Sequence, residues 1–380
     1  MNHKHLLAGV AATALLTAGS AFAASHSGDQ LQAQAAMIDA LSKKVEQLSA
    51  NQGGVVNGVK GATVKISGHV NRAVMIGSDN NDNTFFQFVD NDASSTRFTF
   101  DVDTPISATS SAGMRLEAQV ESNSSIAANA PGQVNADTAT NGLRHAYVYV
   151  KGSFGGLVLG QQSDASDGIT QQGFNYAALA DINPENTAGQ NLAGAGIGSF
   201  GDGGRTDSIR YDTPSLGGFK ASISAEDTGQ VHVGAVYGGQ VGGIGVLAGL
   251  AYLGETAGSD GLVSGSLGFN FGPVSLNTAF STNASDDNEG SDRFFWYVSA
   301  AHRGSYVDMG ATSIAIDVQA VRGVQDGGGA ARFATDGFSV GLGLVQGIAP
   351  GVDAYAMARQ YDQEGGGDAT VGMAGMRVRF

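Results

Sequence analysis

The sequence predicts an all-β protein: a transmembrane antiparallel β-barrel of about sixteen strands, preceded by a short helical segment. Three observations support this prediction. Segments of about ten residues alternate apolar and polar side chains, which is the length and period of a tilted membrane-spanning strand. Glycine accounts for 58 of 380 residues and cysteine for none, so stability must come from backbone pairing and burial rather than from disulfides. The connections between these segments alternate between short and long.

Residues 1–23 have the pattern of a secretory signal peptide. Lys4 precedes an apolar run from Leu6 to Leu16, and Ala21-Phe22-Ala23 forms a small-x-small cleavage site. The run is too short to span a bilayer as a helix, and no later stretch reaches ~18 uninterrupted apolar residues. We therefore expect an exported protein without a transmembrane helix.

Residues 24–60 have a helical period instead. Apolar residues recur at spacings typical of a coiled-coil seam, with Gln34 in one seam position. They are Leu31, Ile38, Leu41, Val45 and Leu48. This makes about three heptads, followed by a glycine-rich linker. Self-association through the seam is the favoured interpretation, and a single amphipathic helix is the alternative.

From Thr63 onward the period is two. In the segment from Met114 to Glu121, one face carries Met, Leu, Ala and Val and the other carries Arg, Glu, Gln and Glu. A charged face opposite an apolar one suits water inside a barrel and lipid outside it. Sixteen such segments begin near residues 63, 95, 113, 143, 156, 206, 218, 230, 243, 261, 273, 292, 310, 333, 350 and 369. From Asp353 to Tyr361, aromatic and charged residues share a parity, so the sequence leaves those faces unassigned.

The connections predict which end of the barrel is which. Short turns contain Gly or Pro, as in Gly152-Ser153-Phe154-Gly155 and Ala349-Pro350-Gly351. Longer polar connections cover about 77–93, 122–141, 163–204, 282–291 and 323–332. Short periplasmic turns and long outer loops are the asymmetry expected of an outer-membrane barrel.

Two stretches resemble the trimeric general porins of Gram-negative bacteria. The segment from Leu143 to Gly160 is similar to the strand–turn–strand before that family's third loop, and the segment from Ser208 to Phe219 is similar to the hairpin after it. Phe380 matches the family's assembly signal for the barrel insertion machinery. The heptads are similar to those of the DcaP-like subgroup, which carries a periplasmic coiled coil. The resemblance covers 61–380 and implies a homotrimer in outer-membrane lipid.

The resemblance also implies where the pore is narrowest. In the family, the third loop folds inward and faces a ladder of basic residues; here that loop is 163–204, and its segment from Asp181 to Glu185 is similar to the family's acidic element. The expected constriction residues are Arg97, Arg115, Arg144, Arg205, Arg210, His69, Gln161, Asp181 and Glu185. His69 stands where lysine is common and Gln161 where arginine is frequent, and both reduce the positive charge.

Charge physics supports the same expectation. Arg97, Arg115 and Arg144 share the polar parity of their strands, so they would project into water. Arginines opposite acids would set up a transverse field across a narrow pore. The alternative interpretation is that these residues form salt bridges that brace the loop, and the two roles are compatible.

Other classes of function find little support. No G-x-S-x-G elbow or Ser–His pairing suggests catalysis, and a net charge of −15 argues against nucleic acid as a partner. Asp79, Asn81, Asn83 and Asp90 occupy EF-like positions, but Thr84 replaces the required glycine. We favour a solvated acidic loop there, as for the acids between Asp286 and Asp292, and expect no metal or other cofactor.

We therefore predict an outer-membrane porin, not an enzyme, that lets ions and small hydrophilic solutes diffuse passively. One rival hypothesis is a selective porin that binds small carboxylates through Arg97, Arg115 and Arg144. The other is a structural tether in which residues 24–60 reach the cell wall. Saturable flux would separate the first rival from free diffusion.

Overall fold

The computed structural model describes residues 61–79, 83–126, 141–185, 187–193, 202–255, 261–284, 294–322, 336–364 and 367–380. The predicted signal peptide, the heptads of 24–60 and the acidic stretch from Asp286 to Asp292 lie outside these ranges. Within them, no helix is long and apolar enough to cross a membrane.

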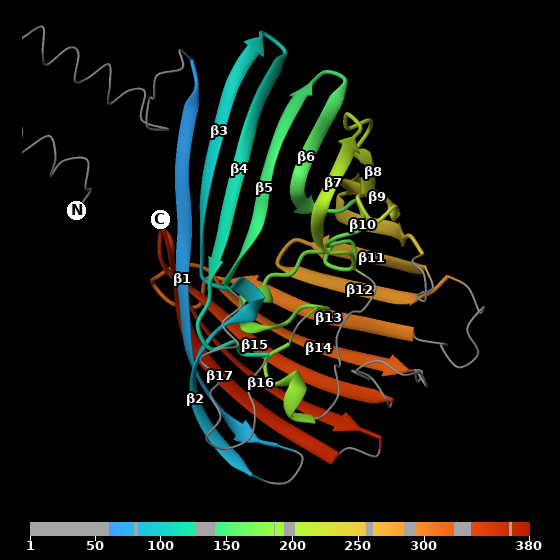
Figure 1. Cartoon of the computed structure of the whole chain (residues 1–380). Coiled ribbons are helices and arrows are strands. Elements are labelled where there is room, and N and C mark those ends of the chain that lie inside the picture. The colour runs from blue at the N-terminus through green and yellow to red at the C-terminus, as the bar shows by residue number, and fades with distance from the viewer. Residues whose placement is uncertain are drawn as a thin grey trace, which may run out of the picture. The chain divides into compact units, whose positions relative to one another are not determined.

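The described residues form a closed antiparallel barrel (Figure 1). The strands are β1 (Thr63–Ser78), β2 (Thr84–Asp90), β3 (Arg97–Ser107), β4 (Ser110–Val120), β5 (Asn141–Gly152), β6 (Gly155–Ser163), β7 (Arg205–Asp212), β8 (Phe219–Glu226), β9 (Val231–Val241), β10 (Ile244–Leu253), β11 (Leu262–Phe271), β12 (Val274–Asn283), β13 (Phe294–Gly304), β14 (Thr312–Arg322), β15 (Gly337–Ala349), β16 (Val352–Gln363) and β17 (Gly367–Arg379). From β3 to β17 each strand pairs with the next, and β17 and β3 both pair with β1.

The barrel has sixteen strand positions because β2 and β3 share one of them. The second half of β1 pairs with β2 between Arg72 and Ser78, and its first half pairs with β3 between Thr63 and His69. The prediction of about sixteen strands is confirmed, and every predicted start lies within four residues of an observed one.

The strand β2 was not predicted: its residues fall in the segment 77–93, which the sequence suggested was a loop. Phe86 and Phe88 are exposed on the outer face, whereas Phe85 and Val89 are buried inside. Large apolar residues thus lie on both faces, with Gln87 the polar residue between Phe85 and Val89, and this hides the alternation. A turn containing the 3₁₀ element η1 (Asp92–Ser94) then separates β2 from β3.

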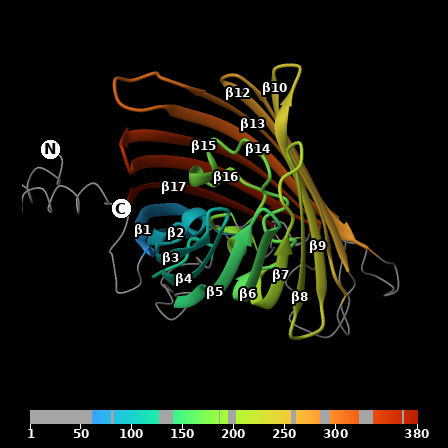
Figure 2. The same cartoon turned by 90° about the horizontal axis from the view of Figure 1, so that it is seen from above.

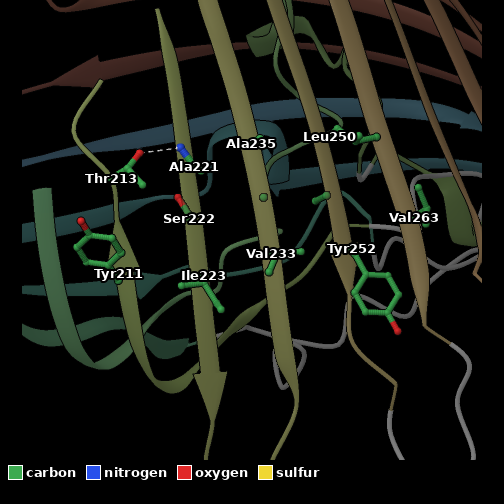
Figure 3. Close-up of a pocket in the computed structure, with 12 residues that line it drawn as sticks. Tyr211, Thr213, Ala221, Ser222, Ile223, Val233, Ala235, Leu250, Tyr252 and Val263 are labelled. Carbon is green, nitrogen blue, oxygen red and sulfur yellow. Dashed lines mark hydrogen bonds between the residues drawn. The ribbon is translucent and has the colours of Figure 1, made fainter. Parts of the chain in front are cut away.

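The outer face of the wall is apolar. Phe98, Leu116 and Val148 are about half exposed, and each alternates along its strand with inward polar or aromatic residues. On β7–β11 this face contains a shallow apolar groove of about 530 Å³, lined by residues such as Tyr211, Ile223 and Leu250 (Figure 3). An exposed apolar belt is what a lipid-facing surface requires.

The long connection between β6 and β7 lies inside the barrel (Figure 2). It contains the 3₁₀ elements η3 (Ala178–Ala180) and η4 (Gln190–Ala193). Leu179, Ala180, Ala188 and Leu192 pack into a buried cluster. The wall side of that cluster is formed mainly by β1, β2, β13, β16 and β17, with residues such as Met75, Val89, Phe295, Tyr355, Met357 and Met373. Part of the barrel interior is therefore a hydrophobic core.

This packing assigns the faces of β16, which the sequence left open. Tyr355, Met357, Arg359 and Tyr361 are buried and point inward, whereas the alanines between them are exposed. Aromatic and charged residues share a parity because the loop, not water, covers the inner face of this strand.

Phe380 ends the chain beside the first strand. Its backbone N–H donates to the carbonyl of Gly68 (3.0 Å), and the N–H of Gly68 donates back (3.2 Å). Its ring remains exposed. The role of Phe380 as an assembly signal stays a prediction.

Candidate functional site in the barrel lumen

Three arginines from three strands gather around shared carboxylates on one wall. The Nε of Arg144 lies 2.8 Å from Oε1 of Glu117, and Nη1 of Arg97 lies 3.4 Å from the same oxygen. The Nη2 of Arg205 lies 3.6 Å from Oδ2 of Asp167 in the long loop. We call Arg97, Arg144 and Arg205 the arginine cluster. Three cations against these two carboxylates leave a formal charge of 3 − 2 = +1, and the three arginines keep 20–32% of their side chains exposed.

A β-bulge turns Arg144 inward. The pairing of β4 with β5 passes from Glu117–His145 directly to Ala118–Leu143, so Arg144 has no partner of its own. Below the bulge the alternation resumes with Tyr147 inward and Val148 outward. Bulges re-aim side chains in this way without breaking the sheet.

A glycine supports this region from the next strand. Gly160 lies opposite Tyr147 and has φ = +122°. A Cβ at that position would lie 2.4 Å from the carbonyl oxygen of Ala146. Only glycine fits this backbone without displacing β5.

Two of the other expected basic residues lie nearer the short-turn end. Arg115 donates to Asp101 from Nε (2.8 Å) and Nη2 (3.2 Å). Arg210 donates to Asp212 and also to the carbonyls of Ser163 and Asp164, where the long loop begins. Arg210 thus braces the start of the loop.

The two expected uncharged positions differ from each other. The Nε2 of His69 lies 2.8 Å from the carbonyl oxygen of Ser95, on the turn between β2 and β3. Gln161 shares the parity of the outward-facing Leu159, and its amide donates to the carbonyl of Arg205. Its placement in the lumen was therefore wrong: the inward residue is the next one, Gln162, which is buried.

Asp181 does not face Arg97 and Arg144, and this predicted placement was also wrong. It is fully buried against β14 and β16, where its Oδ2 lies 3.9 Å from Nε of Arg359 and accepts from the N–H of Ala188. The Nη2 of Arg359 donates to Oδ2 of Asp317 (2.8 Å) and to the carbonyl of Asp181 (2.9 Å). We call Asp181, Asp317 and Arg359 the loop anchor. A buried guanidinium needs counter-charges, and Asp181 supplies one of them.

Glu185 lies on the side of the arginine cluster. It shares a hydrogen bond with Asp202 and is close enough to Asp167 and Arg205 to interact with both. Burial, together with the neighbouring Glu185, holds the pKa of Asp202 well above its usual range. Burial raises the pKa of Glu185 as well, so at a given pH this pair adds less negative charge beside the arginine cluster than two ordinary carboxylates would.

The loop anchor gives a pH dependence with a definite sign. Burial raises the pKa of Asp181 to about 7, although Arg359 opposes the shift. An unfolded aspartate titrates near about 3.9, so Asp181 binds its proton more tightly in the folded protein. The stability that this proton binding adds to the folded state is complete below about pH 4 and is lost as the pH rises through about 7. We expect amide exchange between Ala177 and Ile182, corrected for intrinsic rates, to be faster at pH 8 than at pH 5. The difference should vanish in Asp181→Asn; if the variant keeps it, another group titrates.

Several residues of this site were missed from the sequence. Glu117 alternates with Arg115 on the polar face of β4, so the sequence did contain a signal for it. The roles of Asp167 and Arg359 had no such signal, since each depends on the path of the loop.

One group of possible metal ligands lies close together among the described residues. Ligand atoms of Asp164, Glu226 and His232 are within 4.8 Å of one another. The Nε2 of His232 pairs with Oε1 of Glu226 (2.9 Å), and Gly254 donates to its other ring nitrogen. Asp164 accepts from backbone N–H groups of the loop, including Gly204. We assign these residues to fixing the two ends of the loop.

The EF-like spacing does not form a loop. Because residues 84–90 are a strand, Asp79 and Asp90 lie at opposite ends of β2. Asp79 instead accepts from Asn83, and Asp90 accepts from the N–H of Thr96.

Comparison with known proteins decides the family. The family model described as "Gram-negative porin" matches residues 9–366. The chain belongs to the Gram-negative porin family. It is an outer-membrane porin, and the family's general role is passive diffusion through a water-filled pore. No curated protein matches its sequence.

Solved structures show the same fold at low sequence identity. The anion-selective porin from Comamonas acidovorans is 16% identical, has a TM-score of 0.59, and matches 84% of this chain and 100% of its own. The outer-membrane channel DcaP of Acinetobacter baumannii is 15% identical, with a TM-score of 0.53 and coverages of 86% and 100%. OmpT of Vibrio cholerae is 14% identical, with a TM-score of 0.55 and coverages of 86% and 100%.

Proposed function

We propose that this porin is a non-enzymatic diffusion channel whose narrowest passage lies between the arginine cluster and the inward loop, and that it favours small anions over cations of equal size. The observation that carries the proposal is the surplus of positive charge where Arg97, Arg144 and Arg205 share Glu117 and Asp167. The acid expected to oppose them, Asp181, is paired with Arg359 on the other wall.

The position of the loop supports a one-sided pore. Its η3 turn packs against Met357 and Tyr355 on β16, so it covers that wall. On the other side, Lys151, Lys220 and Arg115 keep about 38–56% of their side chains exposed. Water and solutes would pass along this polar wall, and its charges would set selectivity.

A planar-bilayer recording tests the proposal. With a gradient of potassium chloride across the bilayer, we expect a stable conductance. The sign of the reversal potential should show that chloride permeates more easily than potassium. The preference should weaken as salt rises, because the Debye length falls from about 10 Å at 0.1 M to about 3 Å at 1 M. A protein that inserts without conducting would refute the proposed pore. A preference for cations at low salt would refute the proposed surplus of positive charge at its narrowest point.

We also propose a homotrimer with the N-terminal heptads in the periplasm. One of the similar solved structures is a trimer form of OmpT of Vibrio cholerae. If the heptads stabilise a trimer here, deleting residues 31–48 should lower the temperature at which the trimer dissociates in detergent, as read on a gel. Equal dissociation temperatures would mean that the heptads do not stabilise the trimer. A trimer band in both samples would then show that the barrel alone holds the subunits together.

A further inference from the structure

We infer that the lumen carries a second binding subsite, for a small aromatic carboxylate, between the arginine cluster and the short-turn end of the barrel. This inference rests on the proposed pore for its access route. We call the site the vestibule subsite. Its main residues are Asp101, Arg115, Tyr147, Tyr149, Lys151, Gly156 and Lys220, which line a cavity of about 480 Å³. Cavities of this size typically hold small molecules.

The strand register aligns these residues in adjacent rows. Arg115 lies across from Asp101 on one side and from Tyr147 on the other. Two residues further along β5, Tyr149 lies opposite Val158, and after another two residues Lys151 lies opposite Gly156. The two tyrosines and the lysine therefore point into the lumen from one strand, in order toward the short-turn end.

Two donors in the subsite remain unused. Arg115 commits Nε and Nη2 to Asp101, while its Nη1 has no hydrogen-bond partner among the described residues. The hydroxyl of Tyr147 likewise has none among them. Both groups belong to neighbouring positions in one row, so a carboxylate could accept from both at once. A charged acceptor makes the stronger kind of hydrogen bond here.

An aromatic surface lies beside these donors. The rings of Tyr147 and Tyr149 have centroids 6.4 Å apart and are tilted by 58°. Tyr149 is held in place because its hydroxyl donates to Asp103 (2.6 Å) and its ring lies over Gly113, which has no side chain to displace it. The Nζ of Lys151 is 4.7 Å from the centre of the same ring. A ligand ring would find offset or edge contacts on these fixed rings.

Glycine leaves the space that the ligand needs. A Cβ added to Gly156 would meet only the Cβ of Lys151, at 3.9 Å. The wall next to Lys151 is therefore hollow, bounded by Asp212 and Lys220 on the following strands.

The charges around the subsite suit a single negative charge. The cations are Arg115, Lys151, Arg210 and Lys220, and the acids that pair with them are Asp101, Asp103 and Asp212. The formal sum is 4 − 3 = +1. A monocarboxylate with one aromatic ring, such as benzoate, matches this charge, the two donors and the tyrosine surface.

The test uses the whole protein in detergent and in bilayers. Saturation-transfer NMR on the detergent-solubilised porin should show benzoate binding more tightly than cyclohexanecarboxylate and acetate. In bilayers, benzoate should reduce the chloride current saturably. The NMR measurement does not need conduction, so binding without current would refute the proposed pore while supporting the subsite.

Two substitutions and a control locate the ligand. Gly156→Val fills the hollow without changing charge and should weaken benzoate binding about tenfold or more. Tyr147→Leu should weaken it about three- to tenfold. Gly142→Val, at the other end of β5, is the matched control, since an added Cβ there meets nothing within 4 Å.

Three results would overturn the inference. They are equal binding of benzoate and cyclohexanecarboxylate, unchanged benzoate binding in Gly156→Val, and loss of binding in Arg144→Ser alone. The last would place the anion in the arginine cluster instead of the vestibule subsite.

Discussion

Replacing Arg97 and Arg144 together by serine should reverse the ion preference of the pore from anions to cations. The wild-type cluster has a formal charge of +1, and the double variant leaves Arg205 against Glu117 and Asp167, a charge of 1 − 2 = −1. Reversal potentials in a potassium chloride gradient at low salt measure the change directly. The shift should shrink at 1 M salt, where charges are screened within about 3 Å.

The matched control for this experiment is Asp181→Asn. It also removes a charge from the predicted constriction, but that charge is buried beside Arg359. We therefore expect its reversal potential to equal that of the wild type. A shift in Asp181→Asn as large as that in the arginine variant would mean that the loop lies differently and faces the cluster after all.

Replacing Arg359 by methionine should release the loop from its wall. The substitution leaves Asp317, and Asp181 where it is ionised, buried without their counter-charge. Breaking a buried ion pair in this way typically costs about 3–5 kcal/mol. We expect a larger and noisier single-channel conductance, and cleavage of the segment 164–204 by added protease.

Removing the acids as well separates charge from packing. In Arg359→Met combined with Asp181→Asn and Asp317→Asn, no buried charge is left without a partner, so most of the protection of the loop should return. If the triple variant has the same conductance and the same protease cleavage as Arg359→Met, the shape of the arginine side chain matters more for holding the loop than its charge.

The strands could be read from the sequence because alternation is a local property. Met114 to Glu121 shows both faces of the wall in eight residues, and β4 follows that pattern. The pattern fails wherever something other than water covers the inner face. On β2, Phe85 and Val89 point inward into the core cluster and leave Gln87 as the single polar residue between them, so the alternation is not recognisable.

The candidate site was predictable only in part, and for a related reason. Arg97 and Arg115 lie on regular strands, so parity alone turns them inward. Arg144 reaches the lumen through a bulge, and Asp181 meets Arg359 across 178 residues of chain. Neither a bulge nor a long-range pairing changes the local spacing of residue types. The sequence therefore indicated which loop folds inward but paired its Asp181 with the wrong arginines.

The hydrophobic cluster beneath the loop divides the barrel wall into two kinds of surface with different tolerance to change. Around Met75, Phe295, Tyr355 and Met373 the inner face is packed like the interior of a soluble domain, so altered side-chain volume there should affect folding before permeation. On β3–β8 the inner face meets solvent near the short-turn end, around Arg115, Lys151 and Lys220, and substitutions there should alter which solutes pass while the barrel still assembles. New solute preferences can therefore arise on one side of the pore without disturbing the scaffold on the other.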